Sequence, residues 1–229
     1  MVHLLLAVIY LSFISLGLPD ALLGSAWPTI YGELGVPVSY MGIISMIISA
    51  GTVVSSLCSD RLTRRLGAGG VTALSVGVTA AALFGFSVSR SFLALCLWAV
   101  PYGLGAGSVD AALNNYVALH YTSRHMSWLH CMWGIGASLG PYAMTFALAG
   151  GQGWNMGYRY ISFLQIGLTV ILVLSLGLWK GRSGAEEGGE EQALPLRRAI
   201  AAPGTREMML LFFCYCALEI GRASCRERV

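Results

Sequence analysis

The sequence predicts an all-α membrane protein, and its composition and its long apolar runs both indicate this fold class. Of the 229 residues, 56% are hydrophobic and 11% are charged, and the mean hydropathy is +0.69. A soluble domain carries about 25% charged residues, so this chain has too few to cover a water-exposed surface. The net charge of +3 does not indicate a nucleic-acid partner. Most basic residues lie in short gaps between apolar runs, where they act as topology signals.

Six apolar runs have about the length that a bilayer requires, because its core of about 30 Å takes about 20 helical residues. The runs are residues 4–30, 38–59, 71–88, 92–117, 128–148 and 160–179. Pro19 and Pro101 lie within the first and fourth runs. Since proline removes a backbone hydrogen bond, we expect a kink in both helices.

The charges between the runs predict the orientation of the chain. With the N-terminus in the cytoplasm, nine basic residues fall in cytoplasmic segments and two fall outside. Such a bias is typical of membrane proteins, and we expect a bacterial plasma membrane protein with a cytoplasmic N-terminus. The nine are Arg61, Arg64, Arg65, Arg124, Lys180, Arg182, Arg197, Arg198 and Arg206, and the two are Arg90 and Arg159.

The composition divides the chain into four segments. Residues 1–180 form the six-helix bundle, and residues 181–205, with four glutamates among glycines, are a solvated cytoplasmic linker. Residues 206–218 start a seventh transmembrane helix. Residues 219–229 carry three arginines where that helix still needs apolar residues. One choice of codons for this tail resembles a sequencing adapter, so we expect an artefactual end.

An internal repeat relates the first and fourth runs. Gly17-Leu-Pro-Asp20-Ala21 is similar to Gly107-Ser-Val-Asp110-Ala111, at an offset of 110 minus 20, or 90 residues. A transporter half built from two inverted three-helix repeats shows this arrangement.

The strongest motif follows the second run, where the chain reads Ser56-Leu-Cys-Ser-Asp60-Arg61-Leu-Thr-Arg64-Arg65. This resembles the cytoplasmic Gly-x-x-x-Asp-Arg-x-Gly-x-Arg/Lys-Arg loop of the major facilitator superfamily, with Ser56 and Thr63 in place of the glycines. The resemblance implies a conformational latch made by Asp60, Arg61, Arg64 and Arg65, whose charge-assisted hydrogen bonds break when helices separate. A simple positive-inside loop would explain the arginines but not Asp60.

Two carboxylates lie within the predicted spans, where an ionisable group is a functional candidate because its desolvation is costly. Helical spacing places Phe13, Asp20 and Trp27 on one face of the first run, and an acid beside aromatic rings suits a polyhydroxyl ligand. Asp110 and Asn114 share a face of the fourth run. Because the two acids lie at different depths, we expect no contact between them. The alternative is that both acids only bond neighbouring helices.

The arrangement of these two acids with Asn114 and the pair Leu129-His130 resembles that in the fucose-permease-like branch of proton-coupled sugar transporters. In the fourth run the facilitator pattern Arg-x-x-Gln-Gly-x-Gly reads Ala99-Val-Pro-Tyr102-Gly103-Leu-Gly105, so a proton relay without the arginine would run through the acids. The resemblance implies no cofactor, a proton as coupling ion, a sugar as substrate and a missing C-terminal half as partner. The substrate- and proton-binding residues would be Phe13, Asp20, Trp27, Asp110, Asn114 and His130.

A glycine motif in the fifth run, Gly136-Ala-Ser138-Leu-Gly140-Pro141, allows three interpretations. Small residues permit close helix packing. Gly-x-x-x-Gly-Pro also resembles the fifth-helix motif of facilitator antiporters, which would favour drug efflux. Gly-x-Ser-x-Gly can mark a nucleophilic serine, but that elbow needs a strand before it. A rhomboid-type protease places its histidine in a later helix than the serine, whereas all four histidines here precede Ser138. We therefore expect no enzyme.

The sequence as a whole predicts a secondary transporter that takes up sugar with protons by alternating access. A drug/proton antiporter is the main alternative, and a non-transporting membrane scaffold or an intramembrane serine protease is a distant one.

Overall fold

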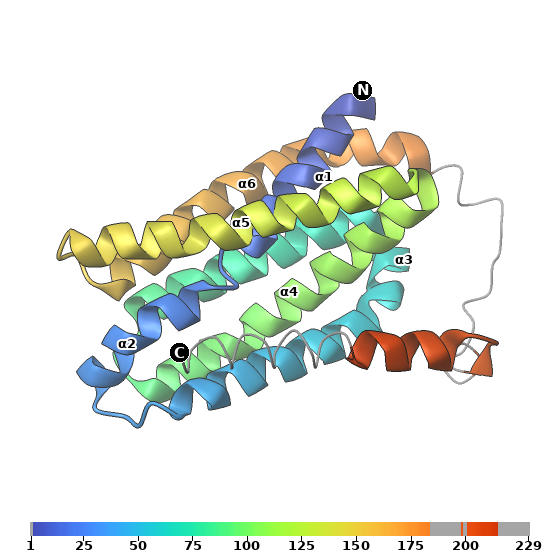
Figure 1. Cartoon of the computed structure of the whole chain (residues 1–229). Coiled ribbons are helices and arrows are strands. Elements are labelled where there is room, and N and C mark those ends of the chain that lie inside the picture. Colours follow the sequence, from blue (N-terminus) through green and yellow to red (C-terminus); the bar gives the residue numbers. More distant parts are fainter. Residues whose placement is uncertain (1, 184–197, 199–200, 215–229) are drawn as a thin grey trace. The chain divides into compact units, whose positions relative to one another are not determined.

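The computed structural model describes residues 2–183, 198 and 201–214, which fall into two compact units, Met1–Gly184 and Ala185–Val229. The first unit is all-helical (Figure 1). Its helices are α1 (Val2–Gly17), α2 (Leu22–Leu34), α3 (Tyr40–Val88), α4 (Phe92–His120), α5 (Ser123–Ala149) and α6 (Trp154–Ser183). In the second unit residues 205–214 are helical. No strand occurs among the described residues, and the all-α prediction is confirmed; the predicted tail, residues 219–229, lies outside them.

The first apolar run is broken where only a kink was predicted. The helix α1 ends at Gly17, Pro19 follows, and α2 begins at Leu22. The connecting turn is held by backbone bonds such as Asp20 N–H to Gly17 O, 3.2 Å. In α4, by contrast, the helix continues through Pro101 without interruption.

The second and third runs form one element, α3, with a break at Gly67. This glycine has φ 71° and ψ 161°, a left-handed φ that side-chain-bearing residues rarely adopt. The helix continues from the second run up to this break, so the motif around Asp60 lies on a helix and not in the loop that the sequence predicted.

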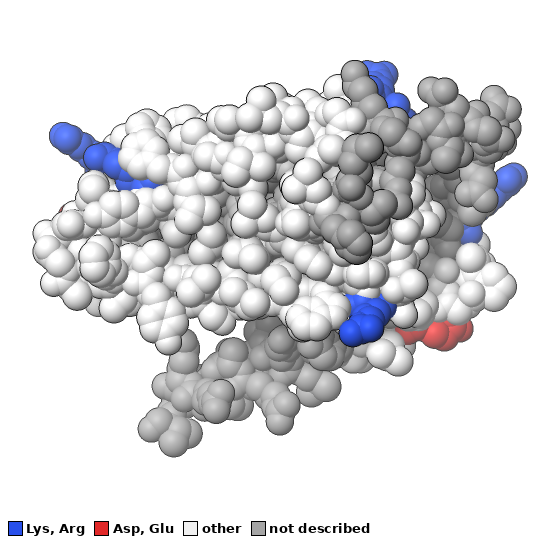
Figure 2. Space-filling model, turned by 90° about the horizontal axis from the view of Figure 1, so that it is seen from above, with Lys and Arg blue, Asp and Glu red and all other residues white. Residues whose placement is uncertain are grey.

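Four described stretches are long and apolar enough to span a membrane: Leu4–Leu34, Tyr40–Val88, Phe92–His120 and Trp154–Trp179. Because Gly67 divides the second stretch, these four contain five of the six predicted runs. The remaining run lies in α5, which has 27 residues. On the face shown in Figure 2, blue Lys and Arg side chains gather towards the two ends, and a largely uncharged band separates them.

Glycines set the closest helix contacts of the bundle. A Cβ atom at Gly136 would collide with the carbonyl oxygen of Ile14, and one at Gly140 with that of Leu18. The helix α5 therefore crosses the end of α1 with its backbone almost in contact. The packing interpretation of the fifth-run glycines is confirmed by this contact.

Candidate functional site

Asp20 lies in the turn between α1 and α2, and its carboxylate accepts hydrogen bonds from two aromatic side chains. The indole Nε1–H of Trp133 on α5 donates to Oδ2 at 2.8 Å, and the hydroxyl of Tyr102 on α4 donates to Oδ1 at 3.3 Å. Gly17 allows this approach, because a Cβ there would lie 2.8 Å from the backbone nitrogen of Ala137 on α5. Asp20 thus joins three segments of the bundle.

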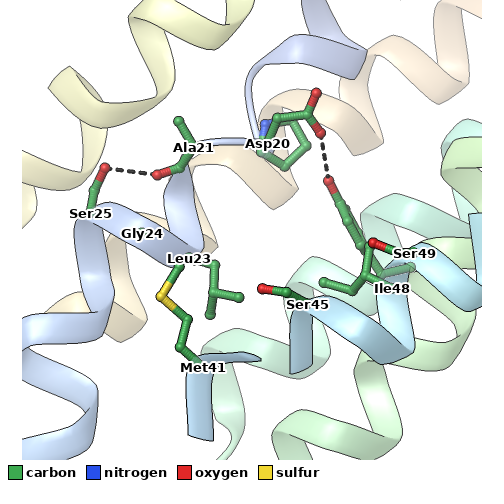
Figure 3. A pocket seen from close by; sticks show the side chains of 11 residues that line it. Asp20, Ala21, Leu23, Gly24, Ser25, Met41, Ser45, Ile48 and Ser49 are labelled. Carbon is green, nitrogen blue, oxygen red and sulfur yellow. Dashed lines mark hydrogen bonds between the residues drawn. The ribbon is translucent and has the colours of Figure 1, made fainter. Parts of the chain in front are cut away.

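A cavity of about 420 Å³ opens beside Asp20. Figure 3 shows Asp20 above it, Leu23 and Met41 along it, and Ser45 and Ser49 on α3 opposite. The volume lies within the range of small-molecule sites, about 300–1,000 Å³. Neither serine hydroxyl has a hydrogen-bond partner among the described residues, so both are available to a ligand. The wall combines apolar surface with separate hydroxyl and carboxylate groups.

Asp110 is exposed on α4 and is bonded within its own helix. The Asn114 amide donates to the Asp110 carboxylate at 2.9 Å and to its backbone carbonyl at 3.0 Å. His130, another predicted site residue, lies on α5 and is exposed. No hydrogen bond joins Asp110 to Asp20 among the described residues, which agrees with the prediction that the two acids make no contact.

Phe13 and Trp27 do not face the cavity. Phe13 is 1% exposed and packs edge-to-face on the His130 ring, with ring centroids 6.2 Å apart. Trp27 is 3% exposed and donates its indole N–H to the carbonyl oxygen of Val38 at 2.8 Å. The break before α2 changes the helical spacing, so the single face expected for Phe13, Asp20 and Trp27 does not form.

The predicted latch contains one ion pair among the described residues. Arg64 Nη2 lies 2.8 Å from Asp60 Oδ2, one helical turn away on α3, and both side chains are more than half exposed. Arg61 and Arg65 line a surface cavity of about 510 Å³ with Arg64. Of the three arginines, only Arg64 is bonded to the Asp60 carboxylate among the described residues, and the latch function stays a prediction.

Four residues of the site escaped the sequence analysis: Ser45, Ser49, Tyr102 and Trp133. Two signals could have found some of them. Tyr102 occupies the glutamine position of the fourth-helix pattern, and Trp133 follows His130 by three residues, which places both on one face of α5. For Ser45 and Ser49 the only signal in the sequence was their four-residue spacing.

Comparison with known proteins identifies the family. The sequence model of the Major Facilitator Superfamily matches residues 9–221. The chain belongs to this superfamily. An uncharacterized transporter, y4wD of Sinorhizobium fredii, is 32% identical over 119 residues, which is 49% of this chain and 31% of that protein. The 3-(3-hydroxy-phenyl)propionate transporter of Escherichia coli is 26% identical over 186 residues, 76% of this chain and 41% of that protein.

The chain thus spans less than half the length of these curated relatives. Both relatives are named as transporters, and the long apolar helices of this chain are those of an integral membrane protein.

Proposed function

We propose that this transporter half takes up a small hydroxylated solute, a sugar, together with protons by alternating access. The observation that carries the proposal is the Asp20 carboxylate, which accepts hydrogen bonds from α4 and α5 at the edge of a serine-lined cavity. A carboxylate in a membrane bundle is costly unless it meets a polar pathway. Sugar hydroxyls can donate to Asp20 and bond Ser45 and Ser49, while Leu23 and Met41 contact the apolar face of the ring.

Proton coupling follows from the partners of Asp20. As an anion it accepts from Trp133 and Tyr102, whereas a protonated carboxyl has less acceptor capacity and gains a donor of its own. Protonation would therefore weaken contacts between the α1–α2 turn and two other helices, which biases the packing of those helices. Asp110, whose carboxylate is exposed and accepts the Asn114 amide, is the second proton-handling group of this proposal.

The cavity opens on the surface of the first unit, and this half supplies only part of the wall. The curated relatives are more than twice as long as the segments that match them, which supports a second half that would close the site. With the N-terminus in the cytoplasm, the part of α3 between Asp60 and the break at Gly67 would face the cytoplasm.

A second candidate substrate is an aromatic carboxylate, because one relative is a 3-(3-hydroxy-phenyl)propionate transporter. Such an anion needs a cation, and no Lys, Arg or His lines the cavity beside Asp20 in the part of the chain that the structure describes, which places this substrate second. Drug antiport has less support, since helix packing already explains the glycine motif of α5.

The test is substrate-driven proton uptake in vesicles that contain the full-length gene product. Sugars, phenylpropionates and an efflux dye are compared for wild type, Asp20→Asn and Asp110→Asn. Glu207→Gln is the control, because Glu207 is exposed and does not line the cavity. We expect sugar-driven proton uptake that Asp20→Asn abolishes. Unchanged coupling in both aspartate variants would rule out the proposal, and a response to phenylpropionates alone would favour the second substrate.

A further inference from the structure

A second polar cavity lies at the end of the bundle where α5 connects to α6, on the left in Figure 1. Its volume is about 460 Å³. Three segments line it: the end of α2 with Glu33, the α3–α4 connection with Arg90, and the first turns of α6 with Arg159. The Asn155 amide on α6 donates to the carbonyl oxygen of Ser87 at 3.0 Å, which joins two of these segments.

The charges in this cavity are unbalanced. Arg90 and Arg159 supply two positive charges and Glu33 one negative charge. The Glu33 carboxylate accepts the indole N–H of Trp154 at 2.7 Å, and neither guanidinium forms an ion pair with any carboxylate that the structure describes. The cavity therefore keeps a net positive charge.

The strongest sign of a ligand is Arg159 itself. Its Nε atom is buried and has no hydrogen-bond partner among the described residues. Leaving a buried donor of a charged group unsatisfied is costly, so native proteins supply an acceptor in such places. The helix α6 begins at this cavity, and the free N–H groups of a helix N-terminus also favour an anion.

We propose that this cavity binds a phosphate-type oxyanion through Arg90 and Arg159. Guanidinium groups bind phosphate oxygens in a bidentate manner. The ligand could be the headgroup of an anionic phospholipid or a soluble phosphate. The cavity is lined by the ends of membrane-spanning stretches, where lipid headgroups are expected, and its volume exceeds that of one phosphate ion; both points favour the lipid.

The test uses the purified 229-residue chain in detergent and measures binding of short-chain phosphatidylglycerol by native mass spectrometry, with phosphatidylcholine as the neutral lipid. We expect Arg90→Gln and Arg159→Gln to weaken phosphatidylglycerol binding about tenfold each, because each removes a charge-assisted contact. Arg124→Gln removes an exposed arginine from the first turn of α5 and should leave binding unchanged. Glu33→Gln should strengthen binding, since it removes the negative charge while its amide oxygen can still accept from Trp154.

Inorganic phosphate separates the two sources. If millimolar phosphate displaces the lipid, and does so less well in Arg159→Gln, the site takes a soluble oxyanion. If phosphate does not compete, the headgroup is the ligand. Unchanged lipid and phosphate binding in both arginine variants would overturn the proposal, and so would an equal loss in Arg124→Gln. The gain expected for Glu33→Gln cannot come from misfolding, and its absence would also count against the site.

Discussion

Asp20 and Asp110 occupy equivalent places in the repeated motif, yet their surroundings differ. Each acid follows a glycine by three residues, and both glycines pack against a neighbouring backbone: Gly17 against Trp133 and Ala137 on α5, Gly107 against Thr52 on α3. Asp20 then accepts hydrogen bonds from two other helices. Asp110 accepts one from Asn114 on its own helix.

The difference follows from the residue before each acid. Pro19 precedes Asp20, and the chain leaves the helix there, so that the carboxylate can be reached from α4 and α5. Val109 precedes Asp110 within an uninterrupted helix, where the nearest polar partner is one turn away. A motif that occurs in both repeats can therefore serve as an interhelical junction in one and as a local pair in the other.

Substitutions of Val109 and Pro19 test whether the residue before each acid causes the difference between the two sites. Val109→Pro should destabilise the protein by about 3 kcal/mol or more, because proline removes a backbone hydrogen bond from the middle of α4. Pro19→Ala should change stability by less than about 1 kcal/mol, since the chain already leaves the helix at that point. Unfolding in detergent with increasing denaturant measures both. Equal losses of stability in Val109→Pro and Pro19→Ala would show that the helix break at Pro19 does not explain the different surroundings of Asp20 and Asp110.

The crossing of α1 and α5 can be tested through its glycines. Gly136→Ala places a methyl group against the carbonyl oxygen of Ile14, and overpacking of this kind costs about 1–3 kcal/mol. Gly134→Ala, two residues away on α5, meets nothing within 4 Å and serves as the matched control. Thermal unfolding should show a loss for Gly136→Ala alone. A similar loss in both variants would contradict the role of the crossing, because the higher helix propensity of alanine would stabilise both variants.

Removing one donor from each acid sharpens the comparison further. Trp133→Phe deletes the 2.8 Å bond to Asp20 and should lower substrate-driven proton uptake by the full-length transporter about tenfold, as expected for one charge-assisted bond. Asn114→Ala should lower it about threefold or less, because an exposed pair within one helix contributes little. Trp128→Phe, on the same helix and 48% exposed, is the control. The interhelical role of Asp20 would be contradicted by a larger effect of Asn114→Ala.

The smallest effect is expected for the exposed ion pair of the latch motif. Arg64→Gln removes the partner of Asp60 one turn away, and such surface pairs contribute about 0.3–0.5 kcal/mol. Thermal unfolding should hardly change, whereas transport should slow if the pair acts as a latch. Arg124→Gln is the control for loss of charge. Transport at the wild-type rate in Arg64→Gln would contradict the latch function, and the motif would then serve only to orient the chain in the membrane.

The sequence by itself determined what depends on local spacing and composition. Long apolar runs imply helices in a membrane, and the spacing of Gly136 and Gly140 implies a close helix contact. The pair of Asp110 and Asn114 also follows from the helical repeat, because its members are four residues apart.

Only the tertiary structure decided what surrounds Asp20. Its donors Tyr102 and Trp133 are 82 and 113 residues away in the chain, and no local pattern relates such distant positions. The same limit explains the loss of Phe13 and Trp27 from the site, since the helical repeat that placed them beside Asp20 holds only while the helix continues. Where α1 ends, the packing of α4 and α5 against the turn determines which side chains meet the acid.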